Sequence, residues 1–114
     1  MQRIQIIFNL FKRPKILTFW DLRFQEEEFS KAAKIALLNT KNSPEIVKCL
    51  ESSLNQYSAR VEFSNGYFIS VKFGTMFYSN GKDTYEVYSN LDRDVFGHLT
   101  SEEVTEYMIK IQNQ

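Results

Sequence analysis

The sequence predicts an α+β domain in which an antiparallel β-meander of three or more strands packs against two central helices and a C-terminal helix. Two Asn-Gly turns, within 64–66 and 79–83, lie between segments of alternating apolar and polar residues, as in β-hairpins. Helical spacing of apolar residues marks 26–57 and the last residues of the chain. The 114 residues fit a single domain (1–114), with a basic and apolar segment at 1–23, a helical pair at 26–57 and the sheet with its last helix at 59–113.

The segment EFSNGYFISVKFG (62–74) is interpreted as a hairpin rather than a phosphate-binding loop. Its two glycines lie eight residues apart, with no Lys-Ser/Thr pair and no strand-to-helix junction after them. A three-residue loop, Ser64–Gly66, places Phe63 opposite Tyr67 and aligns the apolar faces of both strands, whereas a two-residue loop would mix the faces. The longer loop also puts Gly66 at the left-handed position that follows a type I turn.

This register predicts which residues share a face of the sheet. Val61 lies opposite Ile69 on the apolar face, and Phe68 lies opposite Glu62 on the other face. A third strand follows at 84–89 and completes a meander. Whatever covers Phe68, whether a helix, another subunit or a partner, is therefore a clue to function.

The two central helices are predicted at 26–39 and 44–57 from apolar residues at helical spacing. The first begins with three glutamates (26–28), where the helix dipole favours negative charge. Ser43 is the predicted N-cap of the second helix, with Pro44 at its first position.

The segment DVFGHLTSEEV (94–104) is interpreted as a corner between a strand and the last helix. Gly97 provides a bend, and Thr100 with Glu103 forms a capping box. The apolar residues expected to contact the sheet are Val95, Leu99 and Val104.

The N-terminal residues fit more than one structure. Residues 1–12 have the spacing of a short amphipathic helix, although their alternation also fits a strand. Residues 7–15 have the composition of a membrane-surface anchor, but a packed helix is the commoner outcome. Residues 15–24 alternate in the manner of a fourth strand, with Phe19 and Trp20 on opposite faces.

Charge and composition restrict the functional class. Basic and acidic residues number 14 each, which argues against a protein built mainly to grip nucleic acid. The charge is uneven, because 1–23 hold five basic residues and one acidic residue, whereas 83–114 hold seven acidic and two basic residues. A single cysteine permits no intramolecular disulfide and favours a reducing cytosol. No apolar stretch has the length needed to cross a bilayer.

We expect no catalytic, cofactor or metal site, and hence no enzyme. His98, the only histidine, lacks the partners of a catalytic base and is interpreted as a surface residue of a turn. Cys49 lies near the apolar stripe of the second central helix and is expected to be a buried, inert thiol. The DRD triplet (92–94) lacks the ligand series of a calcium loop, and the glutamates at 26–28 are explained by the helix start.

The residues expected to contact a partner are aromatic or acidic. They are Phe68, Tyr88, Glu86, Asp92, Asp94, Glu102 and Glu106. In one interpretation, the acidic end competes with nucleic acid for a basic groove on another protein. In the alternative, Phe68, Tyr88 and Tyr78 stack on single-stranded bases, as in sheet-based nucleic-acid binders. That alternative is weakened because Lys72 and Lys82 stand there among acidic residues.

The motifs FSNGYFISV, YEV and DVFGHLTSEEV lie in this order within about 60–113. Together they resemble small bacteriophage and prophage proteins of unknown function. That family usually has tyrosine where His98 stands, which further weakens a catalytic role for this histidine. The resemblance leaves 1–58 uncovered, and it implies a mobile-element origin and no known chemistry.

We therefore expect a non-enzymatic phage or prophage accessory protein that binds a host protein in the cytoplasm of a bacterium. Inhibition of a bacterial defence system, in the manner of an anti-CRISPR protein, is one such role. The alternatives are a nucleic-acid-binding module that uses the sheet aromatics, and a small structural or oligomeric phage protein. A homo-oligomer is compatible with all three, since exposed aromatic residues often mark interfaces.

Overall fold

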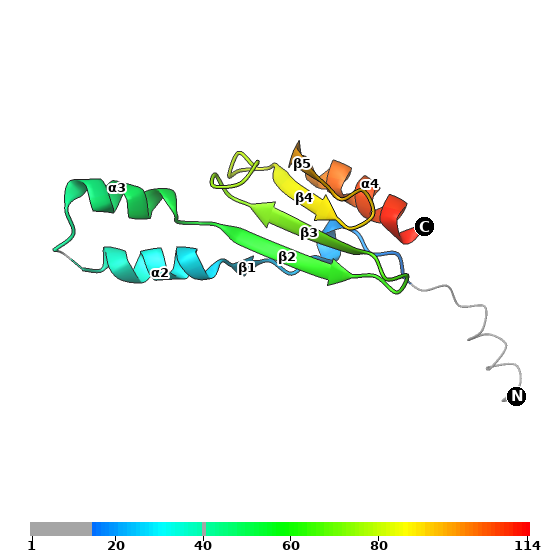
Figure 1. The fold of residues 1–114 in the computed structure, drawn as a ribbon, viewed down its shortest axis with the longest axis horizontal. Coiled ribbons are helices and arrows are strands. Elements are labelled where there is room, and N and C mark those ends of the chain that lie inside the picture. Colours follow the sequence, from blue (N-terminus) through cyan, green and yellow to red (C-terminus); the bar gives the residue numbers. More distant parts are fainter. Residues whose placement is uncertain (1–14, 40) are drawn as a thin grey trace, which may run out of the picture.

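The computed structural model describes residues 15–39 and 41–114, and these form the predicted α+β fold with an antiparallel meander (Figure 1). The predictions for 1–12, and nearly all of the 7–15 segment, lie outside the described residues. Five strands follow one another across the sheet in chain order: β1 (Gln25–Glu26), β2 (Tyr57–Glu62), β3 (Phe68–Phe73), β4 (Tyr85–Ser89) and β5 (Asp94–Leu99). The helices are the 3-10 turn η1 (Phe19–Asp21) and the α-helices α2 (Glu28–Leu37), α3 (Pro44–Ser52) and α4 (Ser101–Gln112).

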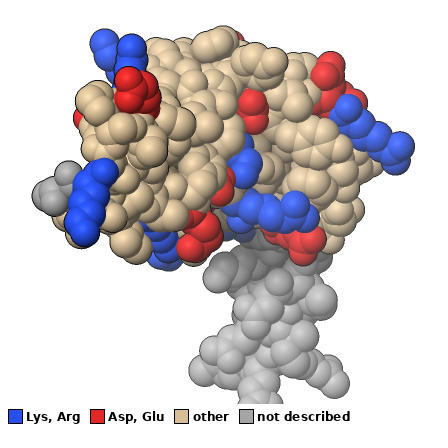
Figure 2. Space-filling view, turned by 60° about the vertical axis from the view of Figure 1, so that its left-hand side comes forward, with Lys and Arg blue, Asp and Glu red and all other residues tan. Residues whose placement is uncertain are grey.

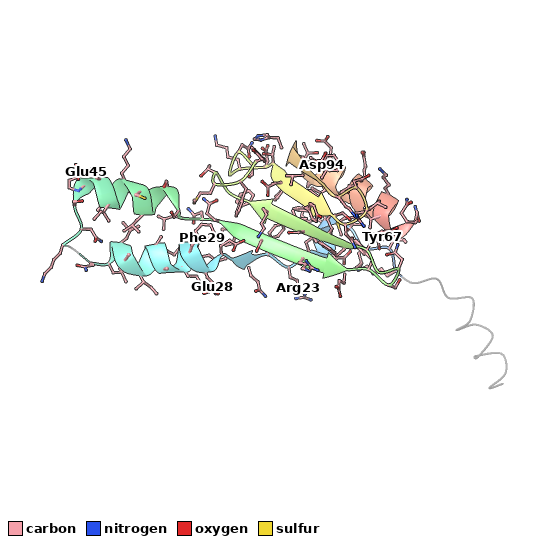
Figure 3. All side chains as sticks on the ribbon, in the orientation of Figure 1. Arg23, Glu28, Phe29, Glu45, Tyr67 and Asp94 are labelled. Atoms are coloured by element: carbon pink, nitrogen blue, oxygen red, sulfur yellow. The ribbon has the colours of Figure 1, made fainter. Side chains whose placement is uncertain are left out.

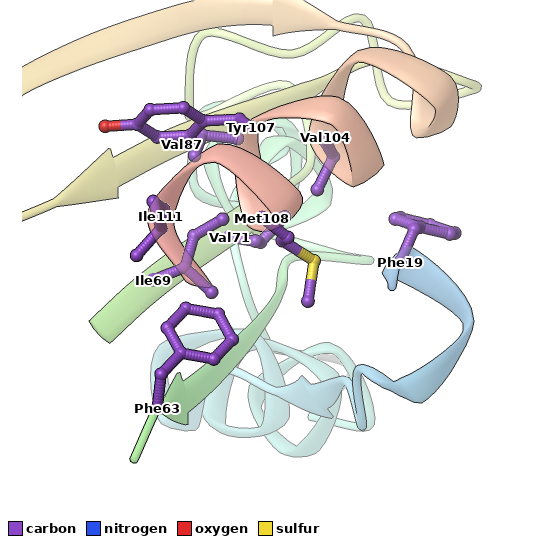
Figure 4. Close-up of a cluster of buried hydrophobic side chains, with 9 residues drawn as sticks. All are labelled: Phe19, Phe63, Ile69, Val71, Val87, Val104, Tyr107, Met108 and Ile111. Carbon is purple, nitrogen blue, oxygen red and sulfur yellow. The ribbon is translucent and has the colours of Figure 1, made fainter. Parts of the chain in front are cut away.

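Helix α4 covers one face of the sheet and closes the core. Its capping box forms as predicted: Thr100 Oγ1 accepts from the Glu103 N–H at 3.2 Å, and the Glu103 carboxylate accepts from the Thr100 N–H at 3.0 Å. Figure 4 shows the apolar side chains of α4 against those of the strands and η1. The buried residues are Phe19, Phe63, Ile69, Val71, Val87, Val104, Tyr107, Met108 and Ile111.

The predicted register of the β2–β3 hairpin is confirmed. The N–H of Phe63 donates to the carbonyl of Tyr67 at 2.8 Å, which closes a loop of three residues. Gly66 has φ +89°, the left-handed conformation that the loop requires. Phe68 pairs with Glu62 and therefore points away from the core face. We call its side of the sheet, which α4 leaves uncovered, the outer sheet face.

The two central helices form but do not lie on the sheet. They extend beyond its end as an antiparallel hairpin and pack on each other (Figure 1). Both are shorter than predicted. Glu26 belongs to β1 and Glu27 is the N-cap of α2, whereas α3 ends at Ser52 because Asn55 takes a left-handed conformation (φ +60°) and β2 begins at Tyr57.

The strand predicted at 15–24 is wrong. A 3-10 turn replaces it, because the Asp21 carboxylate accepts from the Thr18 N–H at 2.9 Å and pairs with Lys15 at 2.8 Å. This turn buries Phe19 and leaves Trp20 exposed. The strands beyond the predicted three are instead β1 and β5.

Residues 94–99 form a full strand rather than only a corner. A bulge interrupts its pairing with β4, and His98 takes a positive φ of +56° there while its N–H donates to the carbonyl of Tyr78 at 2.9 Å. The predicted contact of Val95 with the core is wrong, because Val95 pairs with Tyr88 and lies exposed on the outer sheet face. Leu99 and Val104 do pack against the core, as predicted.

Candidate partner-binding site

The predicted aromatic residues meet on the outer sheet face. The rings of Phe68 and Tyr88 lie 5.9 Å apart between their centroids, and both side chains are half-buried. Arg60 covers Phe68, with its guanidinium carbon 3.8 Å from the ring centroid. Arg60, on the neighbouring strand β2, is thus the residue that covers Phe68. Its guanidinium already occupies one face of the phenyl ring.

A polar groove of about 580 Å³ lies on the same face and includes three cations, Arg23, Arg60 and Lys72. Two of these already have acidic neighbours. Lys72 Nζ lies 2.8 Å from Glu27, and its hydrogen bond holds the pKa of that carboxyl below the usual range. Arg60 lies 3.7 Å from Glu62. The groove therefore presents a nearly balanced set of charges.

The predicted acidic residues do not gather at one place. Glu86 lies on β4 beside Lys72 and accepts from the Tyr78 N–H at 3.2 Å. Asp92 accepts from the Tyr107 hydroxyl at 2.7 Å, and burial, helped by this bond, raises the pKa of Tyr107. Glu106 lies with Asp92 around a crevice between β5 and α4.

The remaining two acidic residues, Asp94 and Glu102, are exposed but do not line that crevice. Arg23 and Asp94 lie at opposite edges of the sheet (Figure 3). Figure 2 shows acidic and basic side chains mixed over the face that it presents.

A different site has the properties of a binding pocket. At the end of the core face that α4 does not reach, a cleft of about 360 Å³ opens between η1, the strands and the loop before β4. We call it the aromatic cleft, and its lining residues are Phe19, Trp20, Leu22, Phe24, Tyr57, Phe73, Lys82 and Tyr85. Its volume lies within the range of small ligand and side-chain pockets, about 300–1,000 Å³.

The rings of the aromatic cleft form one connected cluster. Phe19 contacts Tyr85 with 4.9 Å between ring centroids, and Phe73 contacts Tyr85 at 5.4 Å. Trp20 stands edge-on to Phe19 at 5.2 Å and is 82% exposed. An indole of this exposure beside an apolar cleft leaves a large apolar area in water.

Helix α4 fixes the segment that carries Trp20. The N–H of Leu17 donates to Gln112 Oε1 at 2.8 Å, and Gln112 Nε2 donates back to the Leu17 carbonyl at 2.7 Å. The N–H of Phe19 donates to Thr105 Oγ1 at 3.1 Å. These three bonds reach from residues 17–19 to residues near the end of the chain, so local sequence patterns do not reveal them.

Hydrogen-bond donors at the aromatic cleft have no partner among the described residues. Lys82 forms no ion pair within 15–39 and 41–114, and the hydroxyls of Tyr57 and Tyr85 make no hydrogen bond there. Burial raises the pKa of Tyr85, helped by Asp83, so this hydroxyl keeps its proton at neutral pH. The cleft can thus accept an apolar side chain and donate to an anionic group beside it.

His98 and Cys49, the two candidates for a catalytic role, do not line the aromatic cleft. His98 is exposed, as predicted, but lies in a strand bulge rather than a turn. The prediction of a buried Cys49 is wrong: its thiol is exposed, because it lies beside rather than within the seam between α2 and α3. Among the described residues, no three His, Cys, Asp or Glu side chains are placed to hold a metal ion. Over the same residues, no helix has the length and apolar character of a membrane span.

Compared with known proteins, the chain matches no family model, no curated protein and no solved structure. The resemblance of 60–113 to phage proteins stays a prediction.

Proposed function

We propose that this chain is a non-enzymatic protein that binds a protein partner through the aromatic cleft. The observation that carries the proposal is Trp20, fixed by α4 yet 82% exposed beside a cleft lined with aromatic rings. Tryptophan and tyrosine dominate the residues whose truncation weakens protein interfaces, and they lie next to pockets that a partner residue fills.

The chemistry of the aromatic cleft defines the segment that would fill it. A bulky apolar side chain fits among the rings of Phe19, Phe73 and Tyr85. A carboxylate next to that side chain, from an acidic residue or a chain terminus, would accept from Lys82 and a tyrosine hydroxyl. The partner is therefore a protein that presents an apolar residue beside an acidic group.

The motifs of the C-terminal half support a phage or prophage origin, and this origin makes a host protein the natural partner. We propose that this host protein is a component of a bacterial defence system. The chain would inhibit the host protein by covering the surface that contains the recognised segment, and this needs no catalytic step.

Nucleic-acid binding is the second candidate, favoured by the groove with Arg23, Arg60 and Lys72 beside two aromatic rings. Stacking of a base on Phe68 would require Arg60 to leave the ring, at a cost of about 0.5–1 kcal/mol for an exposed cation–π pair. Retardation of single-stranded oligonucleotides at low salt, lost in Phe68→Ala, would support this candidate. The absence of retardation would remove it.

Capture from a bacterial lysate on the immobilised protein tests the first proposal. We expect specific proteins to be retained by the wild type and lost with Trp20→Ala. Tyr78→Ala is the matched control, because Tyr78 is an exposed aromatic residue outside the aromatic cleft. Retention of the same proteins by Trp20→Ala and the wild type would contradict the proposal.

A further inference from the structure

Polar side chains of neighbouring strands form a regular block in the polar groove on the outer sheet face. Four of them come from β2 and β3, where residues two apart on a strand share a face. They are Ser58, Arg60, Ser70 and Lys72. Arg60 lies opposite Ser70 in the register of these strands. Directly opposite residues have Cβ atoms about 4.5–5.5 Å apart, so one small ligand can contact several of these side chains.

Arg23 adds a second guanidinium to this block. It precedes β1, and it points to the outer sheet face because its neighbours Leu22 and Phe24 line the aromatic cleft on the core face. Continuing the β1–β2 register by two residues places Arg23 opposite Arg60. Like charges that lie directly opposite each other destabilise a sheet. An anion bound between the two guanidiniums would remove this repulsion.

The acidic neighbours leave both guanidiniums available for such an anion. No carboxylate is among the described residues that line the polar groove. Arg23 forms no ion pair within 15–39 and 41–114. The Arg60–Glu62 pair is 3.7 Å long with side chains 57% and 76% exposed, and surface pairs of this kind contribute little. Lys72, in contrast, already has Glu27 as its counter-ion at 2.8 Å.

The ring of Phe68 positions Arg60 beside Ser70. The guanidinium carbon of Arg60 lies 3.8 Å from the centroid of that ring. A guanidinium over an aromatic face keeps the N–H donors around its own edge for hydrogen bonds. Ser70, opposite Arg60 on β3, supplies a hydroxyl donor next to them. The groove thus offers two planar cations and one hydroxyl on a rigid sheet.

We propose that this groove binds a phosphate monoester through Arg23, Arg60 and Ser70. A phosphate monoester has three terminal oxygen atoms and a charge of about −1.5 to −2 at neutral pH, which two guanidiniums and a hydroxyl complement. A phosphodiester has two terminal oxygen atoms and a single charge, so it complements them less well. The groove volume of about 580 Å³ leaves room for the group that is esterified to the phosphate.

This site goes beyond the proposed function. It lies on the opposite face of the sheet from the aromatic cleft, and only Arg23 comes from the segment that joins the two faces. It also differs from the nucleic-acid candidate, because no base stacks on Phe68 and Arg60 stays over the ring.

Titration of the full chain with methyl phosphate at about pH 7.5, followed by NMR spectra of the backbone amides, tests the proposal. The amides of Ser58, Arg60 and Ser70 should shift until they saturate, whereas those of the 79–83 loop should stay in place. Dimethyl phosphate at the same ionic strength should bind much more weakly. A short phosphoserine peptide serves as a second probe. Tighter binding of that peptide than of methyl phosphate would assign the ester to a partner protein, and equal or weaker binding would assign it to a small molecule.

Substitutions that remove one positive charge each test the residues of the site. Arg23→Gln and Arg60→Gln should each weaken the binding of methyl phosphate by about 10- to 100-fold, the effect of losing a hydrogen bond to a charged group. Arg93→Gln is the matched control, because it removes the same charge from the turn between β4 and β5, outside the groove. Arg93→Gln and Trp20→Ala should both bind like the wild type, and the second separates this site from the aromatic cleft.

Three results would overturn the proposal. The first is a wild type without saturable amide shifts up to about 100 mM methyl phosphate. The second is equal affinity for methyl phosphate and dimethyl phosphate. The third is unchanged affinity in either groove variant, or a loss in Arg93→Gln as large as theirs, with amide spectra that show all three variants folded.

Discussion

Replacement of Gly74 by alanine should be far more damaging than replacement of Gly66, although both glycines have positive φ. Gly66 (φ +89°) has open space where the methyl group of an alanine would lie, with no heavy atom within 4 Å apart from those of Gly66 and its two chain neighbours. Gly74 (φ +132°) is buried, and a Cβ there would lie 2.0 Å from Oε1 of Gln56 and 2.6 Å from its Cδ. The buried Gln56 side chain would have to leave its position.

Gln56 joins the base of the α2–α3 hairpin to the loop that follows β3. Its Nε2 donates to the Leu54 carbonyl at 2.8 Å, and its Oε1 accepts from the Met76 N–H at 3.0 Å. Each buried polar group left without a partner costs about 1–3 kcal/mol. Backbone strain adds about 1–3 kcal/mol at either glycine. Strain together with the two unpaired polar groups of Gln56 should lower the free energy of unfolding by about 3–9 kcal/mol in Gly74→Ala, whereas strain alone should lower it by about 1–3 kcal/mol in Gly66→Ala.

Urea unfolding followed by circular dichroism measures both values on the same chain. Gly74→Ala should move the midpoint to much lower urea or leave no cooperative transition. Equal midpoints for the two variants would show that Gln56 does not hold the loop after β3 through its bonds to Leu54 and Met76.

Three further outcomes follow from individual contacts. Met108→Ala should lower the free energy of unfolding by about 2–5 kcal/mol, because Met108 is fully buried; a loss below about 1 kcal/mol would contradict the packing of α4. Thr100→Ala should cost about 1 kcal/mol through loss of the cap to Glu103, and Thr100→Ser should restore most of it. Burial and the bond to Asp92 raise the pKa of Tyr107 in the folded state, so its contribution is present below the unfolded pKa of about 10 and is lost as the pH rises toward the folded pKa. Tyr107→Phe should therefore flatten the decline of stability measured above about pH 10, and an unchanged slope would contradict this assignment.

Local patterns in the sequence were sufficient for the β2–β3 hairpin and the start of α4. In the hairpin, apolar alternation and Gly66 specify one register, and the structure confirms it. In α4, Thr100 and Glu103 satisfy each other's backbone within three residues. Both features depend only on residues close in sequence, which is why the sequence alone predicts them.

The aromatic cleft could not be predicted in the same way. Residues 15–24 alternate like a strand, whereas the structure forms a turn there through the local bond from Thr18 to Asp21. Long-range bonds to Gln112 and Thr105 then hold this turn against α4, where it exposes Trp20. The helix periodicity of 26–57 is correct, but periodicity identifies an apolar side without identifying its partner. The structure shows that these helices project beyond the end of the sheet and that Cys49 is exposed rather than buried.

Selection of peptides from a displayed random library tests the recognition chemistry of the aromatic cleft most directly. The enriched peptides should share a bulky apolar residue next to an acidic group. A synthetic peptide of that sequence should bind the wild type and Phe68→Ala alike, and should lose about 30-fold or more in affinity with Trp20→Ala, the effect of removing an interface hot spot. Peptides of unrelated composition, or equal affinity for the wild type and Trp20→Ala, would contradict the central claim that this cleft binds the partner.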